Sequence, residues 1–112
     1  MNPYTVVFLE LTGLCRYLYH GEFEESKEAA VRTACLHLLA DLNAIGNPYR
    51  KPSEHMKDIC VAVVLEGHRK LTATERDHYL LPGNFRRIMN GPRAWDILMT
   101  IPPRGVKEWR PA

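Results

Sequence analysis

The sequence predicts a mainly α, single compact helical domain over residues 1–112, and three observations support this fold class. Apolar residues recur at helical spacing in three segments, which indicates two or three longer amphipathic helices. Ser, Thr and Asn stand where those helices would begin. In the second half, proline and glycine divide the chain into short segments, which we expect to wrap around the longer elements as short helices.

The first segment, residues 3–19, has features of both a strand and a helix. Residues 5–8 favour β structure, whereas the apolar residues of the longer segment share one face at about 100° per residue. We predict a helix, with Asn2 as its N-cap and Pro3 at the first helical position. Gly13 weakens this prediction, because glycine within a helix costs about 1 kcal/mol relative to alanine.

The second segment, residues 26–45, has the clearest helical pattern. Its apolar stripe consists of Val31, Ala34, Cys35, Leu38, Leu42 and Ile45. Glu28 and Arg32 form a favourable i,i+4 pair on its flank, and Gly46 ends it. This pattern predicts an amphipathic helix.

The third segment, residues 54–68, is predicted as a helix because Met56, Ile59, Cys60 and Val63 share one face. The apolar run 59–65 is equally typical of a buried strand, and periodicity alone does not separate the two. The alternative fold class is therefore α+β, with strands near 5–11 and 59–65.

Three short segments follow. The sequence Thr72-Ala73-Thr74-Glu75 fits a capping box, which predicts a helix that ends before Pro82. Asn84 is expected to cap another helix, which ends at Gly91. Residues 92–100 are predicted as a last helical or strand-like segment, and residues 104–112 as an irregular tail.

The apolar stripes are buried only if the segments pack together, so they define the expected core. Its members are Leu11, Leu18, Val31, Cys35, Leu38, Leu42, Ile59 and Val63.

The composition is that of a globular protein, and we expect it in the cytoplasm. Hydrophobic residues make up 46% of the chain and charged residues 25%, which argues against disorder. Cys15, Cys35 and Cys60 are predicted to be reduced core residues. The N-terminus lacks a signal-peptide pattern and the run 59–65 is too short to span a bilayer, so neither export nor a membrane partner is expected.

No catalytic, cofactor-binding or metal-binding motif stands out, so we expect a non-enzymatic protein without cofactor or metal. The five histidines lack the close pairing along the chain that zinc sites usually show. The seven glycines form no phosphate-binding loop, and neither serine has the Gly-x-Ser-x-Gly setting of a hydrolase. Glu22, Glu24, Glu25 and Glu28 are interpreted as an exposed, acidic helix start that complements the helix dipole.

Charge is unequally distributed along the chain. Residues 1–67 carry six Lys/Arg against nine Asp/Glu, whereas residues 68–112 carry nine against four and hold both tryptophans. Arginine binds carboxylates bidentately and stacks on aromatic rings, so the basic half predicts a binding surface. Its predicted partner-binding residues are Arg86, Arg87, Arg93, Arg104, Trp109 and Arg110.

The sequence therefore favours a protein–protein interaction module whose partner has an acidic surface. Its size and lack of motifs are those of small inhibitors and adaptors encoded by bacteria or phages, anti-CRISPR and other counter-defence proteins among them. The alternative is a nucleic-acid-binding regulator, for which a net charge of +2 is modest. A third hypothesis is a small enzyme whose site is assembled from residues distant in sequence.

Overall fold

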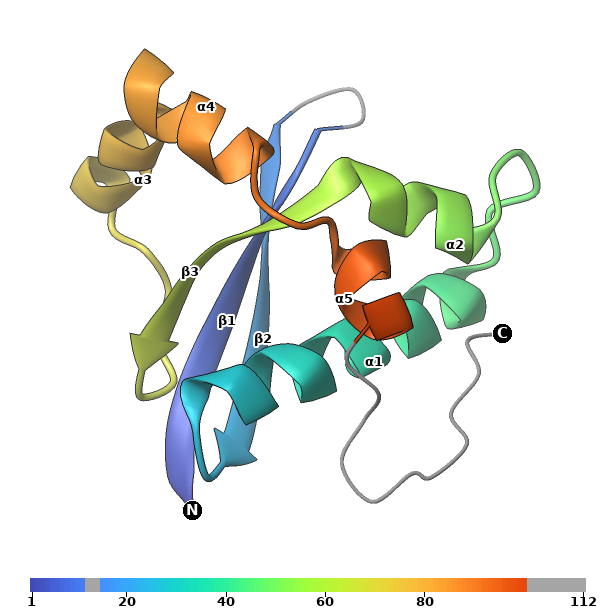
Figure 1. Ribbon diagram of the computed structural model, residues 1–112, viewed down its shortest axis with the longest axis horizontal. Helices are drawn as coiled ribbons and strands as arrows, with labels where there is room; N and C mark the ends of the chain where they lie inside the picture. Colours follow the sequence, from blue (N-terminus) through green and yellow to red (C-terminus); the bar gives the residue numbers. More distant parts are fainter. Residues whose placement is uncertain (12–14, 101–112) are drawn as a thin grey trace.

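The computed structural model describes residues 1–11 and 15–100, in which helices pack on both faces of a three-stranded antiparallel sheet (Figure 1). The elements are β1 (Asn2–Glu10), β2 (Arg16–Glu24), α1 (Lys27–Ile45), α2 (Pro52–His55), the 3-10 helix η1 (Met56–Asp58), β3 (Ile59–Glu66), α3 (Ala73–Leu80), α4 (Pro82–Met89) and α5 (Ala94–Thr100). The strand order is β2-β1-β3, so β1 is the central strand. The fold is α+β, and the predicted mainly α domain is wrong.

The central strand β1 is buried on both faces of the sheet. Val6 and Phe8 face α1, whereas Val7 and Leu9 face the opposite helical layer. A strand covered on both faces has a continuous apolar run instead of alternating polar and apolar residues. The segment 3–19 therefore lacks the alternation of a half-buried strand, and the helix predicted there is wrong.

The third strand, β3, lies where a helix was predicted over residues 54–68. It pairs antiparallel with β1 and has a β-bulge opposite Val7 and Phe8. The apolar run 59–65 lies in this strand, so the helix predicted over 54–68 is wrong beyond the short α2 and η1. The α+β alternative, with strands near 5–11 and 59–65, agrees with β1 and β3. The edge strand β2 was not predicted.

Local capping signals were the most accurate guide to the helices. Ser26 Oγ accepts a hydrogen bond from the Ala29 amide at the start of α1, and Gly46 ends that helix in the left-handed conformation with a φ of 66°. At α3 the predicted capping box of Thr72 and Glu75 is present. The Thr72 backbone amide and the Arg69 side chain hydrogen bond the Glu75 carboxylate and lower its pKa.

The last two helices differ in detail from the expected ones. α4 begins at Pro82, and Asn84 lies inside it. Instead of capping this helix, the Asn84 side-chain amide donates to the backbone carbonyl of His78 at 2.8 Å, which ties α4 to α3.

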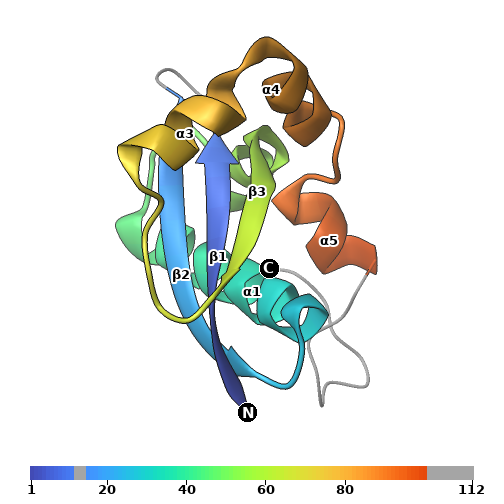
Figure 2. The same ribbon diagram turned by 90° about the vertical axis from the view of Figure 1, so that its left-hand side faces the viewer.

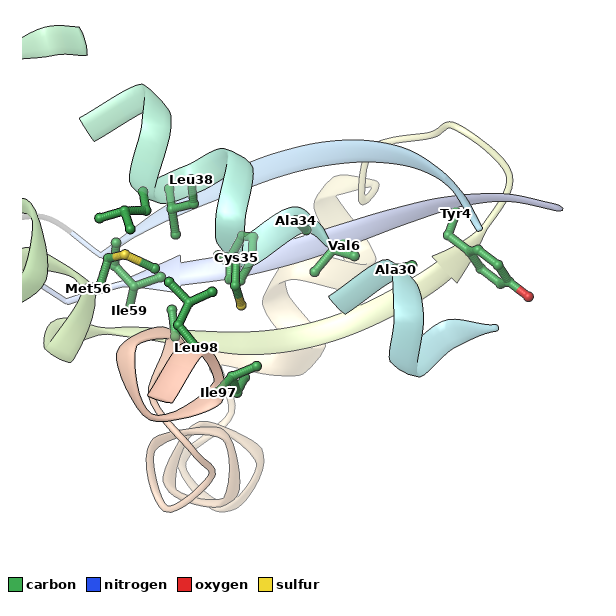
Figure 3. Packing of buried hydrophobic residues seen from close by; sticks show 13 residues of the cluster. Tyr4, Val6, Ala30, Ala34, Cys35, Leu38, Met56, Ile59, Ile97 and Leu98 are labelled. Atoms are coloured by element: carbon green, nitrogen blue, oxygen red, sulfur yellow. The ribbon is translucent and has the colours of Figure 1, made fainter. Parts of the chain in front are cut away.

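The main core lies between the sheet and the layer formed by α1 and α5 (Figure 3). Phe8, Met56, Ile59 and Leu98 are fully buried in it. Of the predicted core residues, Cys35, Leu38 and Ile59 are buried here, and Leu18, Val31 and Leu42 are half-buried against them. Leu11 and Val63 are half-buried in clusters on the opposite face, so the predicted set does not form a single core.

α3 and α4 cover the second face of the sheet (Figure 2). Val7 and Leu65 pack with Leu71 just before α3, and Leu9 packs with Ile88 of α4. Thr5 connects this layer to the sheet, because its hydroxyl donates to the Gly67 carbonyl at 2.7 Å and accepts from the Arg69 amide at 2.9 Å.

The predicted irregular tail, residues 104–112, lies outside the described residues. Within the described part of the chain, no helix combines the length and the apolar character needed to cross a membrane.

Candidate functional site

A pocket of about 490 Å³ opens between β2, the C-terminal half of α1 and α2. Leu18, Leu38 and Leu42 form its apolar wall. Charged and ionisable side chains make up much of the remaining lining, among them Glu10, Arg16, His20, Asp41, Arg50 and His55. A partly apolar pocket with a few convergent polar groups is the usual form of a small-ligand site.

Glu10 is the central charged group of one wall. It lies at the end of β1 and is only 2% exposed. Nε2 of His55 hydrogen bonds one carboxylate oxygen, and Nη2 of Arg16 donates to the other at 2.5 Å. These charge-assisted bonds compensate the buried carboxylate and join β1, β2 and α2. The Arg50 guanidinium on the same pocket pairs with Asp58, so the cations near Glu10 are already paired.

A second cluster of ionisable groups lies between β2 and α1. His20 and Glu22 stand two residues apart on β2 and therefore point to the same face of the sheet, toward α1. His37 and Asp41 stand four residues apart on α1 and therefore share one face of that helix. Nδ1 of His37 lies 2.7 Å from a Glu22 oxygen, and Nε2 of His20 lies 3.6 Å from an Asp41 oxygen.

Burial within this second cluster is uneven. Glu22 is only 6% exposed, His20 is half-buried, and His37 and Asp41 are exposed. Burial lowers the pKa of His20, and the opposing effects of Asp41 and Glu22 do not fully offset it. His20 therefore favours the neutral imidazole, whose unprotonated nitrogen can accept a hydrogen bond or bind a metal ion.

Two of the six predicted partner-binding residues lie together at the surface. Arg86 and Arg87 are exposed on α4 and, with Gly83 and Asn90, line a shallow hollow of about 390 Å³. We call these four residues the α4 surface. Nη2 of Arg87 donates to the Asn84 amide oxygen at 3.2 Å, which steadies the guanidinium.

The other predicted residues do not join the α4 surface in the described structure. Arg93 is half-buried, and its guanidinium donates to Cys60 Sγ at 2.7 Å, so Arg93 contributes to internal packing. Arg104, Trp109 and Arg110 lie outside the described residues. Trp95 packs against the main core and is not a surface residue of the basic half.

The acidic run interpreted as an exposed helix start is divided between two elements, so that interpretation is wrong in part. Glu22 and Glu24 belong to β2, where Glu22 is buried and Glu24 accepts from the Thr33 hydroxyl at 2.6 Å. Of the four glutamates, Glu28 is the one in the first turn of α1.

The cysteine prediction also needs correction. Cys35 and Cys60 are buried as predicted, but Cys15 is exposed. Burial raises the pKa of the Cys35 thiol to about 12, and burial also raises that of Cys60 despite the nearby Arg93.

We therefore expect one thiol to react quickly with maleimide and two to react slowly in the native protein. A maleimide reacts with the thiolate, which is most accessible at Cys15. Mass spectrometry should show Cys15 labelled within minutes at pH 7, and Cys35 and Cys60 labelled only after denaturation. Rapid native labelling of Cys35 would contradict its burial between α1 and the sheet.

Comparison of the chain with family models, with curated proteins and with solved structures finds no match. The functional interpretation therefore depends on the geometry of these two regions, the pocket between β2 and α1 and the α4 surface.

Proposed function

We propose that this chain is a non-enzymatic binding module that binds an acidic protein partner through the α4 surface. The observation that carries the proposal is the pair of exposed arginines, Arg86 and Arg87, beside a hollow on α4. Beyond its chain neighbours and the nearby helix backbone, no described atom lies within 4 Å of the position that a Cβ would take on Gly83, so Gly83 faces open space. A carboxylate side chain entering the hollow can accept two parallel hydrogen bonds from a guanidinium.

Apolar exposure nearby supports a protein partner. Leu80 and Leu81, at the junction of α3 and α4, are 44% and 54% exposed. Protein interfaces combine apolar anchors with arginine, whereas nucleic-acid surfaces depend on several cations that follow the phosphates. In this layer Arg69 pairs with Glu75, and Asp77 is exposed on α3. The mixed charges therefore favour an acidic protein over a nucleic acid.

The pocket between β2 and α1 is a weaker candidate than the α4 surface for binding the partner. Its charged groups are already in ion pairs, as Glu10 is with Arg16 and Arg50 is with Asp58. Arg86 and Arg87 form no ion pair with any described residue, so a partner's carboxylates would meet two cations whose charge is not already paired within the described structure.

The proposal is tested with the double variant Arg86→Gln/Arg87→Gln. Glutamine keeps a polar side chain of helical propensity close to that of arginine, so stability should change by less than about 1 kcal/mol. The matched control is Lys27→Gln/Lys57→Gln, which removes the same charge from exposed positions on α1 and η1.

Wild type and both variants serve as baits for nuclease-treated bacterial lysate, with recovered proteins quantified by mass spectrometry. We expect wild type and control to recover the same acidic protein, and the α4 variant to bind it at least about tenfold more weakly, a loss of ~1.4 kcal/mol. Equal recovery by all three baits would refute the proposal. The same pull-down from untreated lysate gives the comparison, and proteins that are recovered there but lost on nuclease treatment would instead favour nucleic acid.

A further inference from the structure

The side chains of His20, Glu22 and His37 converge from two elements that the core fixes against each other. Each residue offers one ligand atom, a ring nitrogen or a carboxylate oxygen, and the three atoms lie within 4.8 Å of one another. The strand β2 pairs with β1 along its whole length, and α1 packs on the same sheet through Ala34, Cys35 and Leu38. Small side-chain rotations therefore suffice to bring the three atoms onto one ion.

We propose that His20, Glu22 and His37 bind one divalent transition-metal ion, for which Zn²⁺ is the best match. Zinc binds imidazole nitrogen and carboxylate oxygen at about 2.0–2.2 Å. Two histidines and one carboxylate are a ligand set of zinc sites that keep a coordination position open and of related iron sites. This site is separate from the α4 surface, so neither proposal depends on the other.

The burial of Glu22 argues that the cluster is more than a set of surface ion pairs. Its side chain is only 7% exposed, and a buried carboxylate needs a cation or several hydrogen bonds to offset its loss of hydration. Among the described residues, no Lys or Arg forms an ion pair with Glu22. Two imidazoles stand next to this carboxylate, where a bound cation would supply the missing positive charge.

Asp41 extends the site toward the pocket. Its carboxylate oxygen lies 3.6 Å from Nε2 of His20, close to the ~3.3 Å that separates neighbouring ligands of a tetrahedral zinc ion. Asp41 is outside the group of three converging ligand atoms, but it is exposed and one helical turn from His37, so rotation of its side chain can bring an oxygen to the ion as the fourth ligand. His20 and Asp41 also line the pocket, which gives the ion a route of entry and an accessible side.

The fold correction explains why the sequence predicted no metal site. His20 and Glu22, two residues apart, fall between the helices predicted over 3–19 and 26–45, so their side chains had no predicted common face. On a strand, the same spacing places both on one face. The ligand pattern is thus His-x-Glu on β2 opposite His-x-x-x-Asp on α1.

Isothermal titration calorimetry with ZnCl₂ tests the proposal on metal-stripped protein that carries Cys15→Ser. This background removes the exposed thiol, which would otherwise bind zinc. We expect one Zn²⁺ per chain, a higher melting temperature in its presence, and no competition from excess Mg²⁺, which prefers oxygen ligands.

His37→Gln and His20→Gln should each weaken Zn²⁺ binding at least about tenfold, because each removes a ligand. His37 is more than half exposed, so its variant should fold even if the His20 variant does not. His78→Gln, which changes an exposed histidine on α3, is the matched control and should bind like the parent. Absence of saturable Zn²⁺ binding, or equal affinity in His37→Gln and the parent, would overturn the proposal.

Discussion

Replacement of Phe8 by alanine is expected to lower the free energy of unfolding by about 3 to 5 kcal/mol. Phe8 is fully buried on the central strand, packs in the main core beneath α1, and touches the His20 ring edge-on with centroids 5.9 Å apart. The alanine variant loses this apolar contact and leaves a cavity that the sheet and α1 are too rigid to close. Urea denaturation followed by circular dichroism measures the change.

Phe23→Ala is the matched control, because it removes the same side chain from the same sheet. Phe23 is 59% exposed on β2, where its ring packs edge-on against that of His68. Loss of that pair should cost less than about 1.5 kcal/mol. Similar losses in the two variants would contradict the placement of Phe8 in the core.

Replacement of Glu10 by alanine is expected to lower the free energy of unfolding by about 2 to 4 kcal/mol. The variant removes the carboxylate that accepts from His55 and Arg16, and both bonds are charge-assisted. The lost bond to His55 should account for most of the fall in the free energy of unfolding. The His55 side chain is only 17% exposed, so its ring nitrogen is left without a partner. The Arg16 side chain is 61% exposed and can return to water, so its share is smaller.

Glu66→Ala tests whether this loss is specific to the buried carboxylate. Glu66 is exposed at the end of β3, and its replacement should change stability by about 0.5 kcal/mol at most. Thermal and urea unfolding of both variants give the comparison. A Glu10 variant as stable as the Glu66 variant would show that the contacts among Glu10, His55 and Arg16 do not stabilise the fold.

Short-range signals predicted both ends of α1 and the start of α3, but not the start of α4, where Asn84 is not the cap. Ser26, Gly46 and the pair of Thr72 and Glu75 act through hydrogen bonds to backbone groups a few residues away, so their effect is visible in the sequence. The boundaries of α1 and α3 followed from them. The local signals for β1 and β3, residues 5–8 and the apolar run 59–65, did not decide between strand and helix, because strand pairing joins residues far apart, such as Val6 and Val64.

The strands β1 and β2 were not recognised in the sequence because of their positions in the sheet. Residues from Tyr4 to Leu9 are all buried, since helices cover both faces of the sheet, and this removes the polar–apolar alternation of a half-exposed strand. The edge strand β2 has the opposite difficulty. Its sequence, from Arg16 to Glu24, is mostly polar and aromatic, and it has no apolar run that would indicate a strand. Its ionisable groups face α1 and the pocket instead.

The candidate sites were predicted unequally for the same reason. Arg86 and Arg87 are neighbours on one short helix, so the sequence alone places them side by side, and their partner-binding role stays a prediction. Arg93 was selected in the same way, as an arginine of the basic half. Its side chain instead donates to Cys60, a contact between residues 33 positions apart that the local sequence does not show. His20, Glu22 and His37 come together only through the sheet and α1, so no local pattern in the sequence groups them.

The β1–β2 pairing is the feature on which the interpretation most depends, because it directs His20 and Glu22 toward α1. The NMR spectrum of the isotope-labelled protein tests it directly. We expect nuclear Overhauser effects between backbone protons of the strands at the Val6–His20 and Tyr4–Glu22 pairs, and at Val6–Val64 across β1 and β3. Contacts between residues i and i+3 throughout 3–19, as in a helix, with no cross-strand effects, would contradict the fold and the metal site together.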